Sequence, residues 1–278
     1  MFNTTMLFPE GKAKALTLSY DDGVEQDKKL IELLNQYGVK ATFNLNSGCY
    51  AAEGTKYPEG QIHRRMSYNE VTKTYKNSGH EVAVHGLTHP WLEQMPEGMA
   101  AYEVVQDRKN LEEQFGVIVR GMAYPFGTYS DSVVNALKSA GIVYSRTVHS
   151  THQFSLPTDW LRMPATCHHD DPELMTLAKK FVEENPIWNP YLFYLWGHSY
   201  EFEANNNWNV IEEFLAYMGQ RDNVWYATNI EVHDYIEAYR SLQFACDLSR
   251  VKNPTCQKVW FKAGINIYVV EPGETIQL

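Results

Sequence analysis

The chain has 278 residues, with 44% hydrophobic and 21% charged residues, a composition typical of a globular protein with one large core. Its formal net charge of −10 at pH 7 argues against nucleic acid or an anionic membrane surface as a partner. No apolar stretch is long enough to span a membrane and no signal peptide is visible at the N-terminus, so we expect a cytoplasmic protein.

Short β-rich runs alternate with helical patterns along most of the chain. The expected strands are 13–20, 40–46, 80–86, 117–124, 142–148, 191–197 and 224–228. The expected helices are 25–37, 67–77, 99–115, 130–140, 171–185, 207–218 and 229–244. This alternation predicts parallel strands joined by crossover helices. Seven strand–helix units favour an α/β barrel that resembles a TIM barrel but is one unit short. The alternative is an open, doubly wound sheet.

The pattern changes in the last part of the chain. Residues 259–261 and 265–270 read as short strands with no helix between them. We therefore expect a barrel domain over residues 1–244 and a small β-rich C-terminal appendage over residues 245–278.

Two adjacent carboxylates, Asp21 and Asp22, end the first expected strand and precede Gly23. Neighbouring side chains on a strand point in opposite directions, so the two cannot do the same job. Like charges this close resist joint ionisation unless a cation or a proton lies between them. The pair therefore indicates one metal ligand and one base, although a simple turn that caps the next helix is the alternative.

Two histidines, His85 and His89, lie at and just beyond the end of the third expected strand. The spacing can bring two imidazoles to chelating distance, and with one aspartate they would leave coordination positions open, as in catalytic Zn²⁺ sites. The run 124–127 and His198 also follow strands. All of these residues map to the C-terminal ends of strands, where barrel active sites are built.

These residues carry a resemblance to a known family. The run 19–23 (Ser-Tyr-Asp-Asp-Gly) resembles the T-F-D-D-G motif of the polysaccharide deacetylases, that is, carbohydrate esterase family 4 with its NodB-homology domain. The run 85–89 resembles the family's H-[ST]-x-x-H motif. Residues 124–127 and 195–198 resemble its P-P-Y-G and L-x-H motifs. The order agrees over roughly residues 13–240, and the family's fold is a distorted (β/α)7 barrel.

The resemblance implies a role for each matching residue. Asp22, His85 and His89 would bind a divalent metal ion, with Zn²⁺ the first choice and Co²⁺, Ni²⁺ or Fe²⁺ the alternatives. Asp21 would be the general base and His198 the general acid. The backbone N–H of Phe126 would help to hold the oxyanion of the reaction.

The chain departs from the family's pattern at two positions that matter. Ala123 occupies the place of an arginine that pairs with the catalytic base, and we expect Arg162 to replace it, with Arg146 as the alternative. Trp196 occupies the place of a leucine that lines the acetyl-methyl pocket, which makes that wall bulkier.

The run 167–171 (Cys-His-His-Asp-Asp) also contains potential metal ligands. We interpret it as a polar loop that caps the helix expected over 171–185, with Asp170 or Asp171 as N-cap and Pro172 at the first helical position.

The function that the sequence favours is metal-dependent removal of N-acetyl, or O-acetyl, groups from a saccharide or a small acetylated substrate. A non-haem Fe(II) oxygenase could use the same two histidines and aspartate. A sugar-binding barrel that has lost catalysis is a third hypothesis. Both alternatives leave Asp21 and His198 without a purpose.

Overall fold

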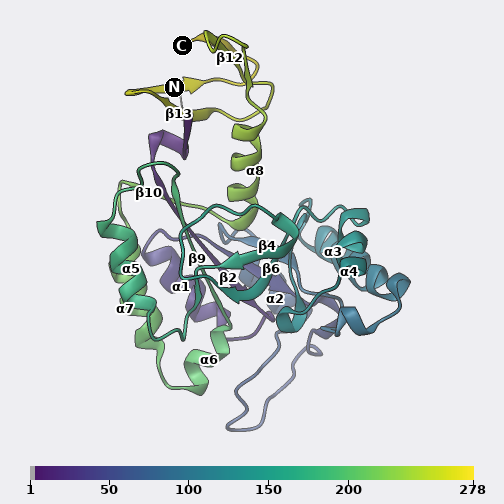
Figure 1. The fold of residues 1–278 in the computed structure, drawn as a ribbon. Helices are drawn as coiled ribbons and strands as arrows, with labels where there is room; N and C mark the ends of the chain where they lie inside the picture. Colours follow the sequence, from purple (N-terminus) through teal and green to yellow (C-terminus); the bar gives the residue numbers. More distant parts are fainter. Residues whose placement is uncertain (1–3) are drawn as a thin grey trace.

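The computed structural model describes residues 4–278, and its centre is a nine-stranded sheet in which all pairs are parallel (Figure 1). Its strands are β2 (Lys14–Asp21), β3 (Ala41–Leu45), β4 (Glu81–Val84), β5 (Gly121–Ala123), β6 (Tyr144–Ser150), β7 (Met163–Ala165), β8 (Cys167–His168), β9 (Tyr191–Gly197) and β10 (Val224–Tyr226).

The sheet closes on itself through one short segment. The order of hydrogen-bonded strands is β7-β6-β5-β4-β3-β2-β9-β8, so β7 and β8 are its first and last strands. Only Thr166 separates them in the chain, and its N–H donates to the carbonyl of Tyr194 on β9 at 2.8 Å. With residues 163–168 counted as one strand, β2 to β6, this segment and β9 make a seven-stranded barrel. The expected distorted (β/α)7 fold is confirmed.

The seventh barrel strand is not the one expected from the sequence. The run 224–228 was expected to fill this place, but β10 pairs only with Lys14–Leu16 of β2, on the edge that β3 occupies further along. The strand that closes the barrel, residues 163–168, contains Pro164 and lacks the apolar, β-branched run that usually identifies a strand. Pairing on both edges stabilises it instead.

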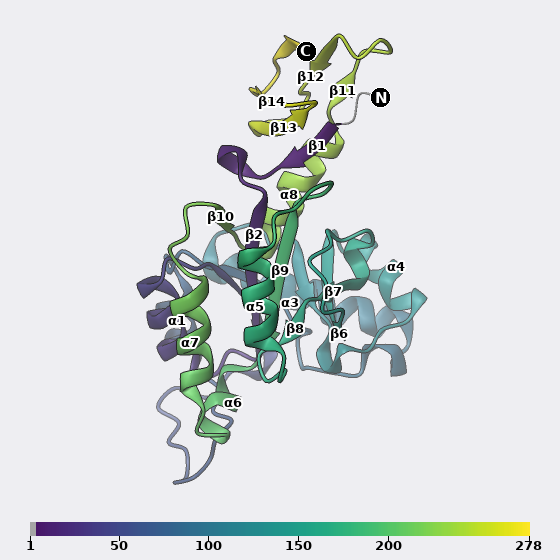
Figure 2. The same cartoon turned by 60° about the vertical axis from the view of Figure 1, so that its left-hand side comes forward.

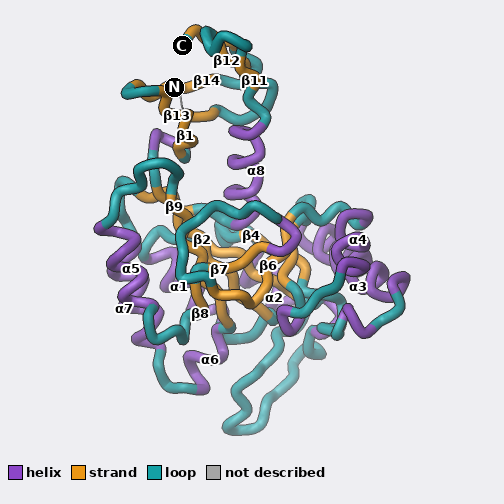
Figure 3. The backbone as a smooth tube through the Cα atoms, in the orientation of Figure 1, coloured by secondary structure: helices purple, strands orange, loops and turns teal. Residues whose placement is uncertain are grey.

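Helices surround the barrel, as the purple segments in Figure 3 show. They are α1 (Asp27–Gln36), α2 (Tyr68–Tyr75), α3 (Glu97–Phe115), α4 (Asp131–Ser139), α5 (Leu174–Glu183), α6 (Ser199–Ala204), α7 (Trp208–Met218) and α8 (Asn229–Arg240). Short 3₁₀ helices are η1 (Pro9–Gly11), η2 (Ser47–Cys49), η3 (Leu92–Gln94), η4 (Pro125–Gly127) and η5 (Trp160–Arg162). Among residues 4–278, no helix combines the length and apolar character needed to cross a membrane.

The remaining strands form two small antiparallel sheets beyond the end of α8, and the C-terminus lies there (Figure 2). One sheet contains β1 (Thr4–Leu7), β13 (Val259–Ala263) and β14 (Asn266–Val270). The other contains β11 (Gln243–Phe244), β12 (Arg250–Lys252) and β15 (Thr275–Gln277). The expected strands near 259–261 and 265–270 are present. The domain boundary at residue 244 stays a prediction, and β1 pairs with β13 rather than with a barrel strand.

One end of the barrel is filled by a buried polar layer around Glu81. Its carboxylate accepts hydrogen bonds from the hydroxyls of Thr42 and Tyr144, both at 2.7 Å, and from the N–H of Ile230 at 3.0 Å. Ile230 lies in the first turn of α8, so this helix start seals the end where the strands begin. The barrel is therefore closed at the end opposite the C-terminal ends of its strands.

Candidate active site

The candidate site lies at the C-terminal ends of the barrel strands. Asp21 is the last residue of β2, His85 directly follows β4, and His198 directly follows β9. Phe126 lies in η4, which follows β5 after one residue. Because parallel strands end at the same rim of a barrel, residues far apart in the sequence meet here.

Asp22, His85 and His89 form a group that could hold a metal ion. Each offers one ligand atom, and these atoms all lie within 4.8 Å of one another. The Nδ1 atom of His85 lies 2.8 Å from the carbonyl oxygen of Ala123, which fixes the tautomer with Nδ1–H as donor and leaves Nε2 free. Burial lowers the pKa of His85 to about 4, so this imidazole is neutral at pH 7. These donors fit a divalent cation that takes nitrogen and oxygen ligands.

Asp22 is held by two residues from the long loop between η2 and α2. The Nη2 atom of Arg65 lies 2.9 Å from Oδ1 of Asp22, and Nε2 of His63 lies 3.2 Å from Oδ2. Burial would raise the pKa of Asp22, but His63 and Arg65 outweigh burial and hold this pKa well below its usual range. Neither residue was expected at the site, because a loop residue carries no strand-end signal.

Asp21 points into the barrel and forms an ion pair with Arg146 of β6. The amide of Asn44 donates to Oδ1 of Asp21 at 2.8 Å. The Oδ2 atom lies 3.8 Å from Nε2 of His85 and 3.8 Å from Nε2 of His198. Burial opposes ionisation, but Arg146 and then the two histidines outweigh it, so the pKa of Asp21 is lowered. The carboxylate is thus ionised and aimed at the site.

The expectation that Arg162 pairs with Asp21 is wrong. Arg162 lies near the surface and pairs with Asp131 at 2.6 Å and Asp159 at 2.7 Å. Arg146, the alternative, is fully buried and extends inward from β6, because alternate residues of a barrel strand face the interior. Its guanidinium carbon lies 4.3 Å from the ring centroid of Trp196, so that the indole covers one face of the cation.

Glu201, in the first turn of α6, holds His198 in place. Its Oε1 lies 3.2 Å from Nδ1 of His198, and its Oε2 accepts the His198 backbone N–H at 3.2 Å. Burial would lower the pKa of His198, but Glu201 and Asp21 outweigh it, and the pKa is raised. Glu201 was not among the expected site residues, although a glutamate three residues after a helix N-cap is a recognisable capping pattern.

Aromatic side chains line the rim beside the histidines. The rings of Trp91 and Phe126 are stacked, with their centroids 3.8 Å apart and an interplanar angle of 4°. The centroid of the Phe126 ring lies 4.5 Å from that of His89. Both side chains are more than two-fifths exposed. Phe126 has φ of +58°, which turns the backbone sharply at this point. Exposed, flat rings are suited to stacking against a sugar ring.

Comparison with known proteins shows which family part of this chain resembles. Residues 9–145 match the family model described as polysaccharide deacetylase. A curated chitooligosaccharide deacetylase from Sinorhizobium fredii is 28% identical over 153 residues, which are 54% of this chain and 61% of the relative. The chain thus covers less than two thirds of that relative's length.

Solved structures share the fold at low identity. A presumed polysaccharide deacetylase from Mycobacterium smegmatis matches with a TM-score of 0.59 and 17% identity, over 84% of this chain and 93% of that one. A family 4 carbohydrate esterase from Streptomyces lividans, in complex with acetate, matches with a TM-score of 0.50 and 15% identity, over 77% of this chain and 92% of that one.

The ion pair of Asp21 and Arg146 generates a stability prediction. Arg146→Met leaves a buried carboxylate without its cation, and we expect unfolding free energy to fall by roughly 3–5 kcal/mol, as for other broken buried pairs. Arg162→Met is the matched control and should leave stability almost unchanged, because its partners are largely solvated. Urea unfolding of both variants measures the difference. Equal losses would contradict the assignment of Arg146.

Proposed function

Since the chain belongs, through residues 9–145, to the polysaccharide deacetylase family, we propose that it is a metal-dependent hydrolase that removes acetyl groups from a saccharide. One observation carries the proposal. An ionised, buried Asp21 lies between a possible metal-ligand set and a histidine, with its Oδ2 3.8 Å from Nε2 of His198. Such a hydrolysis uses a base that accepts the proton of the attacking water and an acid that protonates the leaving group.

Asp22, His85 and His89 would hold the metal ion, and Zn²⁺ suits two nitrogens and one oxygen with positions left open. Such an ion supplies polarisation of the acetyl carbonyl and a lower pKa for water. Arg65 and His63 keep Asp22 ionised, and the carbonyl of Ala123 orients His85. The ligands are thereby pre-arranged by the residues behind them.

Asp21 would accept the proton of the attacking water. It is ionised because Arg146 compensates its burial, and Asn44 fixes the orientation of its carboxylate. Since Oδ1 is used by Asn44, Oδ2 is the oxygen that faces His85 and His198. Proton transfer by a positioned side chain typically contributes about 10²- to 10⁴-fold to the rate.

His198 would donate a proton to the leaving amine or alcohol. Oε1 of Glu201 lies 3.2 Å from Nδ1 of His198, and Nε2 of His198 faces Asp21. The raised pKa of His198 keeps its protonated form populated at higher pH than for a free imidazole. An acid of this kind suits a poor leaving group such as an amine.

Two further residues would shape the acyl site. The backbone N–H of Phe126 would stabilise the oxyanion, a role for which a rigid turn at positive φ is suited because its N–H direction is fixed. Trp196 would form the wall against the acetyl methyl group. Its ring centroid lies 4.3 Å from the guanidinium carbon of Arg146 and 4.5 Å from the ring centroid of His168, and these contacts restrict its rotation.

The substrate we propose is an acetylated oligosaccharide, N-acetylated in the first instance. The support is the name of the rhizobial relative, chitooligosaccharide deacetylase, and the stacked Trp91 and Phe126 rings at the rim. An acetate-release assay on acetylated chitooligosaccharides tests this activity directly.

Removal of the proposed ligands tests the metal requirement. We expect His85→Ala/His89→Ala to lose one equivalent of bound Zn²⁺ and nearly all acetate release, because only Asp22 of the set remains. His149→Ala, an exposed histidine outside the set, is the control and should keep both. Metal content by mass spectrometry and acetate release are the measurements. A double variant that hydrolyses substrate at the wild-type rate would rule out this site.

The role of Glu201 is tested by the pH–rate profile at fixed Zn²⁺. Glu201→Gln removes the charge that raises the pKa of His198, so the acid loses its proton at lower pH. The alkaline limb should therefore move down by roughly 1–3 pH units. Glu203→Gln is the control on the same helix, since Glu203 pairs with Arg64 instead. An alkaline limb that stays in place in Glu201→Gln would show that Glu201 does not tune the acid.

A further inference from the structure

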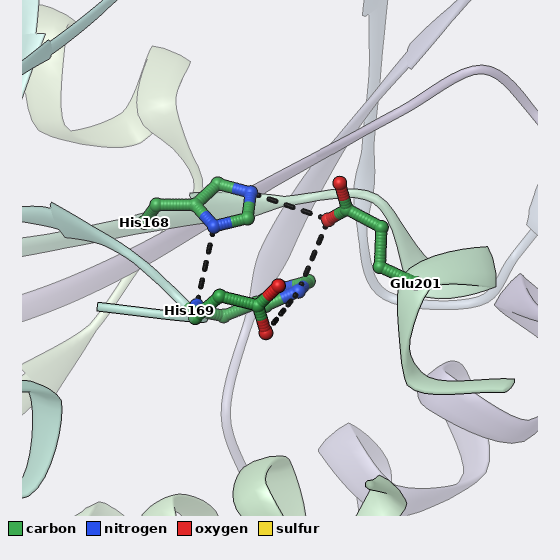
Figure 4. Close-up of side chains that lie close together, drawn as sticks. His168, His169 and Glu201 are labelled. Atoms are coloured by element: carbon green, nitrogen blue, oxygen red, sulfur yellow. Dashed lines mark hydrogen bonds and ion pairs between the residues drawn. The ribbon is translucent and has the colours of Figure 1, made fainter. Parts of the chain in front are cut away.

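A second group of potential metal ligands lies beside the candidate active site, where β8 meets α6 (Figure 4). It comprises His168, His169, Asp170 and Glu201, each with one ligand atom within 4.8 Å of the others. The run 167–171 was expected to be a loop that caps a helix from residue 171. The structure differs, because α5 begins at Leu174 with Glu173 as N-cap, which leaves the His168–Asp170 side chains free of that role.

Three of the distances within this group are close to those expected around a single tetrahedral ion. Oε2 of Glu201 lies 3.2 Å from Nε2 of His168 and 3.1 Å from Nε2 of His169. Oδ1 of Asp170 lies 3.4 Å from the same His169 nitrogen. Ligands at about 2.0–2.1 Å from a tetrahedral Zn²⁺ are separated from one another by roughly 3.3–3.4 Å.

His169 gives an independent reason to expect a ligand. The side chain is completely buried, and its ring lies between Tyr20 and Phe202. Among the described residues, neither ring nitrogen has a hydrogen-bond partner of acceptable geometry. Nε2 lies 3.1 Å from Oε2 of Glu201 but makes no well-directed hydrogen bond, and coordination of a cation would satisfy this buried nitrogen.

We propose that these four side chains bind a second divalent transition-metal ion, for which Zn²⁺ is the best match. Two imidazoles and two carboxylates suit this ion, whereas Mg²⁺ and Ca²⁺ prefer oxygen ligands alone. The inference does not rest on the proposed function. Glu201 can serve both sites, because Oε2 faces this group while Oε1 faces His198.

Binding requires one local change. The N–H of Asp170 now donates to Nδ1 of His168 at 3.2 Å, so that Nδ1 is an acceptor and the ring proton lies on Nε2. Coordination through Nε2 moves this proton to Nδ1, and the Asp170 N–H must turn away. We therefore expect this site to bind Zn²⁺ more weakly than the set of Asp22, His85 and His89, whose His85 tautomer is already correct.

The test uses full-length protein carrying His85→Ala/His89→Ala, so that the first set is removed. After stripping with a chelator and loading with Zn²⁺, this variant should retain one equivalent and should melt at a higher temperature with Zn²⁺ than without it. Adding His168→Gln should weaken this binding by at least ~100-fold, since loss of even an outer partner costs 10- to 100-fold. His152→Gln, which alters a histidine paired with Asp171, is the matched control and should leave binding intact.

If His168→Gln does not fold, Asp170→Asn replaces it. Asp170 lies at the exposed rim of the group, and the Zn²⁺ affinity of this variant is likewise compared with that of His152→Gln. The proposal is wrong if the His85→Ala/His89→Ala protein binds no Zn²⁺. It is equally wrong if His168→Gln and Asp170→Asn bind Zn²⁺ as tightly as His152→Gln. Acetate release does not enter this test, so its outcome is separate from that of the deacetylase proposal.

Discussion

The buried ion pair between Asp21 and Arg146 is the interaction on which the rest of the site depends. A carboxylate taken out of water loses several kcal/mol of hydration, and a cation at contact distance offsets this only when further hydrogen bonds complete the arrangement. Here Asn44 donates to Asp21, Arg146 Nε lies 3.3 Å from the Ser19 hydroxyl, and Trp196 covers the guanidinium. The barrel interior is thus built to keep one carboxylate ionised away from bulk water.

The need of each buried carboxylate for a cation also explains how two adjacent aspartates serve different purposes. Asp21 ends β2 with its side chain inside the barrel, and Asp22 leaves the strand with φ of +86°. Asp22 therefore faces His89, Arg65 and His63, whereas Asp21 faces Arg146 and His198. Because each carboxylate has its own cationic neighbours, both can be ionised although they are next to each other in the chain.

Much of the architecture was predictable from local patterns, and the failures have physical reasons. Strand–helix alternation was sufficient to predict the fold, and the strand-end positions of Asp21, His85 and His198 were sufficient to predict that these residues meet at one rim. Residues 163–168 were not predicted as a strand because their composition does not favour one. Pairing with strands on both edges stabilises this segment. The sequence could not show whether Arg146 or Arg162 pairs with Asp21, because only the closure of the barrel determines which arginine points inward. Glu201 and Arg65 act from a helix start and a loop, where sequence periodicity carries no information.

The central claim is that Asp21 is the base of a hydrolytic reaction, and Asp21→Asn tests it most directly because the amide keeps the shape of the side chain but cannot accept a proton. Acetate release from an acetylated chitooligosaccharide and Zn²⁺ content should be measured on the same preparation. We expect the rate to fall about 10²- to 10⁴-fold while the metal content stays that of the wild type. A variant that releases acetate at the wild-type rate would contradict the account.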